Sequence, residues 1–250
     1  MRRNLGLIAG AMSLWALACG GASLPDDNTP PAAASLSTDA SSGQASSSGG
    51  GEFMGQPVTH WIEQLDEGED AAQRTHAVAA LASFGPGVDG VTEALVAALA
   101  DNEMLVKTGA NRTLARFGPA VAPLLVEALD GNADAAVRAG VALVLGNWAG
   151  DTDVNAALCR ALLRDDDAAV RAAAARGLTV GGADAVAAVA ALTEALKEDE
   201  STAVRQFAAL ALGRIGPAAA EAIPTLEAAE QDPERSVANA ARSALRQVRQ

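Results

Sequence analysis

Residues Asp199–Ala229 read DESTAVRQFAALALGRIGPAAAEAIPTLEAA, and this stretch contains one complete helical hairpin. Val204, Ala208, Leu212 and Ile215 recur at spacings of 4, 4 and 3, which places them on one face of a helix. Gly216-Pro217 then ends this helix and begins a second one, because the missing N–H of proline costs nothing at the first helical position. The stretch therefore predicts two helices joined by a tight turn.

The same unit recurs along the chain, and one valine in each copy serves as a reference position. These reference valines are Val106, Val137, Val170, Val204 and Val237, separated by 31, 33, 34 and 33 residues, and a degenerate first copy begins at Gln73. Five residues before each valine lies a residue that we expect to cap a helix N-terminus: Asp101, Asn132, Asp165, Asp199 or Asp232. A repeat of this length predicts a solenoid.

The residues of each copy are Asp, then Val-Arg, Ala-Ala, Leu-Gly and Gly-Pro, and this pattern resembles HEAT repeats of the short phycobilisome-lyase type. The resemblance implies an all-α fold, a right-handed α-solenoid of about six HEAT-like helical hairpins, over residues 57–250. It also implies that the Asp of each copy caps a helix and that the Arg bridges neighbouring hairpins. The sequence departs from the pattern at Gln73, Lys107, Ala238 and Gly181-Gly182.

Composition favours the same fold. Half of the 250 residues are hydrophobic but only 3% are aromatic, and stacked short helices bury a continuous core of small side chains. The formal charge of −13 opposes nonspecific binding of nucleic acid, so we expect no nucleic-acid partner. We also expect a monomer.

The N-terminus resembles a bacterial lipoprotein signal. Residues 1–18 begin with Arg2 and Arg3, continue as an apolar run too short to span a membrane, and end in Ala-Leu-Ala before Cys19. The resemblance implies lipidation of Cys19 and attachment to the cell envelope, and the lack of Asp after Cys19 favours the outer membrane, facing the periplasm or the exterior. An ordinary secretory signal is the alternative. Residues 19–56 are rich in Ser, Gly and Pro, which predicts a disordered tether.

Candidate catalytic and metal-binding residues are few. The chain has two histidines, His60 and His76, and one thiol besides Cys19, namely Cys159, and none of these lie at the spacing of metal ligands. Cys159 is expected to pack as a small hydrophobic residue. We therefore predict no cofactor, no metal and no enzyme. A HEAT-like lyase or oxidoreductase remains as the alternative by resemblance alone, although the His-Glu pairs of the HEAT-like iron hydroxylases are not present.

The second helix of each hairpin is expected to line the concave surface. Positions three, six and ten residues after the reference valine face away from the apolar stripe and carry no acidic residue. The predicted partner-binding residues at these positions are Arg112, Arg116, Asn147, Arg176, Phe207 and Arg214. We interpret them as a basic groove with Phe207 as an apolar anchor, binding an acidic protein segment as a noncatalytic scaffold. The alternative is that these arginines only solvate a helix face and pair with local acids.

Overall fold

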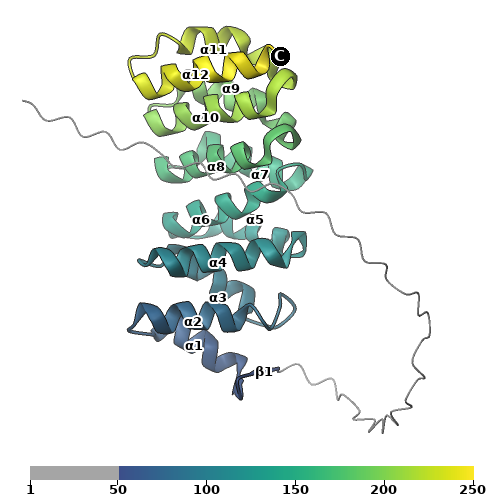
Figure 1. Cartoon of the computed structure of the whole chain (residues 1–250), viewed down its shortest axis with the longest axis vertical. Coiled ribbons are helices and arrows are strands. Elements are labelled where there is room, and N and C mark those ends of the chain that lie inside the picture. Colours follow the sequence, from purple (N-terminus) through teal and green to yellow (C-terminus); the bar gives the residue numbers. More distant parts are fainter. Residues whose placement is uncertain (1–50) are drawn as a thin grey trace, which may run out of the picture. The chain divides into compact units, whose positions relative to one another are not determined.

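A computed structural model describes residues 51–250, and within them helices follow one another as a stack of hairpins (Figure 1). The predicted signal peptide, Cys19 and residues 19–50 of the predicted tether lie outside the described residues. The α-helices are α1 (Val58–Glu67), α2 (Ala71–Leu81), α3 (Val91–Ala97), α4 (Met104–Phe117), α5 (Ala122–Gly131), α6 (Ala135–Leu145), α7 (Thr152–Arg164), α8 (Ala168–Gly181), α9 (Val189–Glu198), α10 (Thr202–Ile215), α11 (Ile223–Ala229) and α12 (Arg235–Val248).

Short 3-10 helices extend or precede several of these helices. They are η1 (Ala98–Ala100), η2 (Pro119–Val121), η3 (Gly146–Trp148), η4 (Gly182–Ala188) and η5 (Gly216–Ala222). At Gly216 the backbone has φ 75°, a left-handed conformation that glycine adopts without strain, and Pro217 follows at the start of η5. The turn predicted at Gly216-Pro217 is thereby confirmed.

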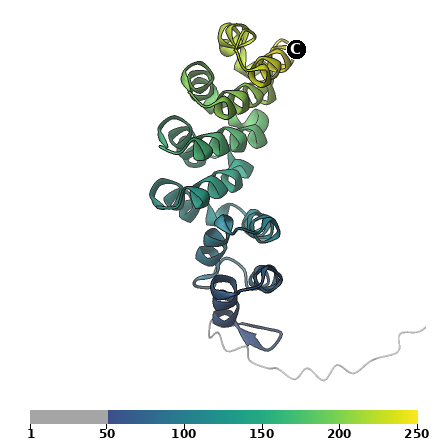
Figure 2. The same cartoon turned by 90° about the vertical axis from the view of Figure 1, so that its left-hand side faces the viewer.

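The helices form two layers. The even-numbered helices pack on one another, with α8 between α6 and α10 and α10 between α8 and α12, while α7 packs between α5 and α9 in the second layer. Figure 2 shows that the described stack curves with the even-numbered helices on its inner side. We call the solvent-facing surface of the even-numbered helices the inner face. The predicted all-α solenoid is confirmed.

The core is a stripe of valine, alanine and leucine that runs through the whole stack. All five reference valines are buried, and so are the leucines eight residues after them, such as Leu212. Glycine lets the even-numbered helices approach closely, since a Cβ added to Gly177 in α8 would lie 2.6 Å from the carbonyl oxygen of Ala142 in α6. Burial of small apolar side chains by close helix contact, rather than by large aromatic residues, therefore stabilises this fold.

Two short strands precede the first helix, and the sequence had predicted none. Strand β1 (Glu52–Phe53) pairs antiparallel with β2 (Gln56–Pro57), and the two-residue turn between them has φ 53° at Met54 and 73° at Gly55. The expectation of a disordered tether is therefore wrong for Glu52–Gln56. The reason is a local packing contact: the ring of Phe53 packs edge-on against the buried ring of Trp61 in α1, with centroids 5.9 Å apart.

The segment Ala168–Glu198 has the length and hydropathy of a membrane-spanning helix, but it is not one straight helix. Gly182 has φ 54°, and Ala185 inside η4 also leaves the helical region. The chain therefore turns between α8 and α9, and these two helices belong to different layers of the stack. This apolar stretch therefore forms two separate helices of the stack, joined by η4.

Candidate functional site

Arginine and aspartate side chains link successive hairpins along the stack, and we call this series the Arg–Asp ladder. Each rung joins an arginine of one hairpin to an aspartate of the next: Arg74–Asp101, Arg138–Asp165, Arg171–Asp199 and Arg205–Asp232. In every rung two guanidinium nitrogens donate to the two carboxylate oxygens, at 2.7–3.2 Å. The prediction that the arginine bridges neighbouring hairpins is confirmed. The paired side chains are only 9–17% exposed, so they are more than ordinary surface ion pairs.

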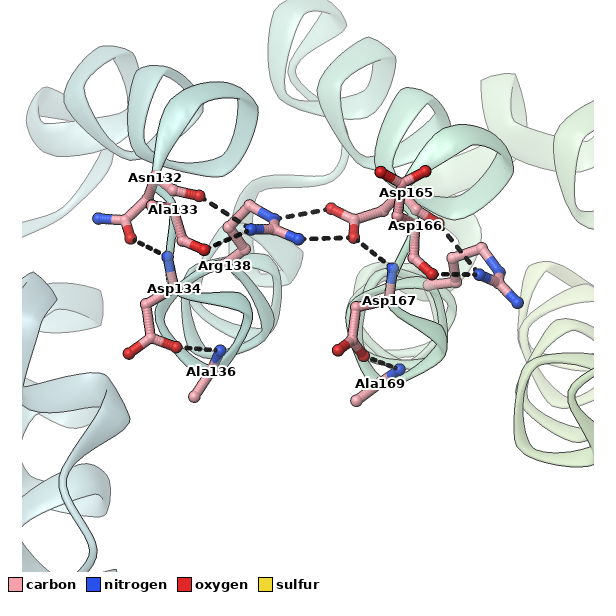
Figure 3. Close-up of polar contacts among 10 residues, drawn as sticks. Asn132, Ala133, Asp134, Ala136, Arg138, Asp165, Asp166, Asp167 and Ala169 are labelled. Carbon is pink, nitrogen blue, oxygen red and sulfur yellow. Dashed lines mark hydrogen bonds and ion pairs between the residues drawn. The ribbon is translucent and has the colours of Figure 1, made fainter.

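The aspartates of the ladder do not cap helices, which corrects the sequence-based prediction. Each of them, and Asn132, accepts instead from the backbone N–H two residues further on, as Asp165 does from Asp167 at 2.9 Å. In the two hairpins drawn in Figure 3 the helix is capped by the residue two positions after the ladder position. Asp134 and Asp167 are these caps, and they accept from the N–H groups of Ala136 and Ala169. The ladder aspartate does not serve as the cap because its carboxylate pairs with the arginine of the preceding hairpin.

Three of the ladder aspartates, Asp101, Asp165 and Asp232, have lowered pKa values, which favours their ionised form. The hydrogen bonds from Arg74 lower the pKa of Asp101 below its usual value, and those from Arg205 do the same for the pKa of Asp232. Burial opposes this effect at Asp165, but the hydrogen bonds from Arg138 and from the Asp167 N–H still leave its pKa lowered. The same pairing recurs from hairpin to hairpin, which identifies these groups as structural rather than as general acids or bases.

One rung is missing, between the hairpin of α4 and the hairpin of α6. Lys107 stands where the other copies have the ladder arginine, and Asn132 stands where they have aspartate. Within residues 51–250 Lys107 makes no ion pair, in contrast to the four ladder arginines. Asn132 still accepts from the Asp134 N–H at 2.8 Å, so the local turn is retained without its charge. The ammonium group of Lys107 therefore stays free of the neighbouring hairpin.

The predicted binding arginines lie exposed on three even-numbered helices. Arg112 and Arg116 lie on α4, Arg176 on α8 and Arg214 on α10, and all four are exposed. Arg116 donates to the Ala82 carbonyl at 2.9 Å. None of the four makes an ion pair within the part of the chain that the structure describes, where the ion-paired cations are the ladder arginines, Arg160, Lys197, Arg242 and Arg249. Pairing with local acids is thus not their role in this structure.

The two remaining predicted residues differ in exposure. Asn147 is exposed in η3 and donates to the Val144 carbonyl at 2.7 Å, so its amide oxygen faces solvent without an intramolecular donor among the described residues. Phe207 is half-buried and packs against the core, so only part of its ring is accessible to a partner. Of the predicted set, Asn147 and Arg176 line one groove together, whereas Arg214 lies further along the stack.

That groove has a volume of about 490 Å³ and crosses α4, α6 and α8 on the inner face. We call it the α4–α6–α8 groove; it is lined by apolar Met104, Leu143 and Val180 and by polar Lys107, Asn147 and Arg176. No acidic residue of the described chain lines it. Sequence reasoning missed the contributions of Met104 and Lys107, although Lys107 was visible as a departure from the repeat.

Metal and thiol chemistry find no support in residues 51–250. No group of three or more His, Cys, Asp or Glu in this range could hold a metal ion. His60 and His76 instead pack edge-on against Trp61, each with ring centroids 5.1 Å from the indole. Cys159 is half-buried, and burial raises the pKa of its thiol to about 11, which keeps it protonated and unreactive at neutral pH.

A family model for HEAT repeats matches residues 58–146, 122–183 and 155–246, and the chain therefore belongs to the HEAT-repeat family. Among solved structures, the complex of CpcE and CpcF of phycocyanin lyase from Nostoc is similar at 21% identity and a TM-score of 0.53, over 61% of this chain and 96% of that one. The Escherichia coli protein YibA is similar at 22% identity and a TM-score of 0.53, over 71% of this chain and 64% of that one. No curated protein matches the sequence significantly.

Human deoxyhypusine hydroxylase in complex with glycerol aligns over 77% of this chain and 96% of its own, at 22% identity and a TM-score of only 0.29, which supports no argument. The prediction that this chain is not an enzyme is nevertheless corrected. A phycocyanin lyase complex shares the solenoid fold, so the fold gives no ground for the exclusion of an enzyme that we drew from the sequence. At this level of identity the likeness establishes the shared fold alone.

Proposed function

We propose that this chain is a lyase-related HEAT-repeat protein that acts by binding an acidic segment of a partner protein on its inner face. The observation that carries the proposal is the exposure of Arg112, Arg176 and Arg214 on that face without an ion pair among residues 51–250. These three cations have the opposite sign to the net charge of the chain, which is −13. Such complementarity favours acidic partners and speeds association with them.

The experiment compares two triple variants of the full chain that remove the same charge. R112A/R176A/R214A removes three exposed arginines from the inner face, and R160A/R164A/K197A removes three exposed cations from α7 and α9 in the other layer. Tagged protein is crosslinked in its native cells, purified, and its partners are counted by mass spectrometry. The inner-face variant is expected to lose partners that the control retains. Identical partner sets for the wild type and both variants would overturn the proposal.

The lyase-related part of the proposal is supported by the similarity to the phycocyanin lyase complex over nearly the whole of that chain. A lyase-related protein would bind phycocyanin or a related acceptor together with its chromophore. Co-expression with a bilin pathway, with and without phycocyanin, tests this directly. Visible absorbance that copurifies with the chain supports a chromophore-handling role, and a colourless protein with unchanged phycocyanin excludes it.

We further propose that the chain is lipidated at Cys19 and held at the cell envelope by that anchor. The support is the sequence around Cys19, which lies outside the described residues, and the Ser-, Gly- and Pro-rich stretch that follows it. Several acyl chains would bind firmly, because each buried CH₂ contributes about 0.8 kcal/mol. Metabolic labelling with an alkyne fatty acid tests the assignment. Label in the wild type and none in Cys19→Ala supports it, and equal labelling of both would refute it.

A further inference from the structure

The start of α4 differs from the start of every other even-numbered helix. The position directly before the reference valine is Ala or Ser in every other copy, including the degenerate first one, but it is Leu105 here. Met104 precedes it, where the other copies have Ala, Thr or Arg. Met104 is 69% exposed and Leu105 is 72% exposed, and they are among the few large apolar side chains left in solvent in the described chain. Two adjacent exposed apolar residues in a single repeat indicate a local contact surface.

The same place is where the ladder lacks its rung. Elsewhere the cation after the reference position is neutralised by a carboxylate of the next hairpin, whereas Lys107 has no ion pair among residues 51–250. The site thus combines a free ammonium group with exposed aliphatic side chains on one turn of helix. Because Asn132 replaces the aspartate of this rung, the next hairpin offers Lys107 no carboxylate at the ladder position.

The α4–α6–α8 groove extends from this turn of helix across two further helices. Met104, Leu143 and Val180 supply apolar contact, and Val180 is 59% exposed. Lys107 lies at one end of the groove on α4 and Arg176 on α8, with Asn147 between them on η3. Neighbouring helices pack about 8–10 Å apart, so two spacings correspond to roughly six residues of extended chain at about 3.3 Å each.

We propose that the α4–α6–α8 groove binds an extended peptide segment of a partner protein, about six residues long, in which acidic and aliphatic residues alternate. This inference rests on the proposed function and specifies its partner. Charge complementarity favours an acidic peptide as the ligand of the groove, because the charged residues that line it, Lys107 and Arg176, are both basic. Aliphatic side chains on one edge of the segment contact Leu143 and Val180, and carboxylates on the other edge pair with the two cations.

The binding test uses the full chain and a fluorescein-labelled, acetylated octapeptide of alternating Glu and Leu, followed by fluorescence anisotropy. Wild type is expected to bind it, and Lys107→Glu and Val180→Asp are each expected to weaken binding at least tenfold. Arg160→Glu, which makes the same charge change on α7, is the matched control and should bind like wild type. Val180 is exposed in α8, so its substitution tests the groove without disturbing the core.

Two control peptides decide the chemistry. A peptide of alternating Lys and Leu that binds as tightly would overturn the charge argument, and one of alternating Glu and Ser that binds as tightly would overturn the apolar one. Sedimentation of the wild type and of Met104→Ser checks for a second copy as the occupant. Self-association of the wild type that Met104→Ser abolishes would assign the groove to a dimer and overturn the inference.

The outcome separates this inference from the function on which it rests. If R112A/R176A/R214A loses partners in cells while Lys107→Glu and Val180→Asp keep all of them, the inner face binds partners but the groove does not. If all of these variants keep every partner, the proposed function itself fails. Loss of the same partner in the triple variant and in both groove variants supports both statements.

Discussion

Replacing Asp165 by asparagine should cost about 2 kcal/mol of unfolding free energy, because it breaks a rung of the Arg–Asp ladder while keeping its local turn. In the wild type the Asp165 carboxylate accepts from Arg138 Nε at 2.8 Å and from a second guanidinium nitrogen at 2.9 Å (Figure 3). It also accepts from the Asp167 N–H at 2.9 Å. The chain already contains the substituted form of this turn, since the Asn132 amide oxygen accepts from the Asp134 N–H at 2.8 Å.

The magnitude follows from what the substitution removes. Hydrogen bonds to charged groups contribute about 1.5–3 kcal/mol, and the Asp165 and Arg138 side chains are only 9% and 15% exposed. Arg138 keeps its bonds to the carbonyls of Asn132 and Ala133, so its guanidinium is not left without partners. The loss therefore lies near the lower end of that range.

Urea unfolding followed by circular dichroism measures the cost, and Asp130→Asn is the matched control. Asp130 forms a single bond to Arg160 at 2.7 Å, with side chains 46% and 47% exposed, and its loss should cost less than about 0.5 kcal/mol. The reasoning is refuted if the two substitutions cost the same, or if Asp165→Asn leaves the urea midpoint unchanged.

Three further predictions concern the stack. Combining Lys107→Arg with Asn132→Asp should build the missing rung. The unfolding free energy of the double variant is therefore expected to exceed the value calculated by adding the effects of the two single substitutions by about 1 kcal/mol. Additive effects would show that no rung forms. Gly177→Ala should destabilise the fold by about 1–3 kcal/mol, because the added Cβ would lie 2.6 Å from a carbonyl oxygen of α6. The control is Gly131→Ala, which should be neutral or slightly stabilising because no atom lies within 4 Å of its added Cβ. Equal urea midpoints for the two variants would contradict this prediction. Because the pKa of Asp101 is lowered in the folded state, its rung contributes its full stability above the pKa of unfolded aspartate, about 3.9, and less as the pH falls through and below that value. Urea midpoints should therefore drop between about pH 5 and pH 3. Constant midpoints would refute the lowered pKa of Asp101.

The fold could be predicted from the sequence because the repeat states the same physical pattern several times. The stripe of Val204, Ala208, Leu212 and Ile215 is buried as expected, and the turn at Gly216-Pro217 lies where its residues place it. Small apolar side chains at helical spacing leave the chain few other ways to bury them. The hairpin of β1 and β2 was missed because its register depends on a contact of Phe53 with Trp61 rather than on a local pattern.

The candidate site could be predicted only in part. Positions facing away from the apolar stripe identified Arg112, Arg176 and Arg214 as exposed, and they are exposed. The role of the ladder aspartates as caps was wrong, since helix propensity at one position does not reveal that an arginine from the preceding hairpin faces it. The groove depends on how three hairpins stack, which no single repeat encodes. The feature of the sequence that pointed to the groove was the replacement of both ladder residues in one rung, by Lys107 and Asn132.

The most direct test of the central claim, that the inner face binds a partner, is site-specific photo-crosslinking in the native cell. The crosslinking residue p-benzoylphenylalanine is placed at Val180, in the α4–α6–α8 groove, or at Ala156, an exposed position of α7 in the other layer. We predict a discrete crosslinked partner from Val180 and none from Ala156. Crosslinks of equal yield from both positions, or from Ala156 alone, would contradict the claim.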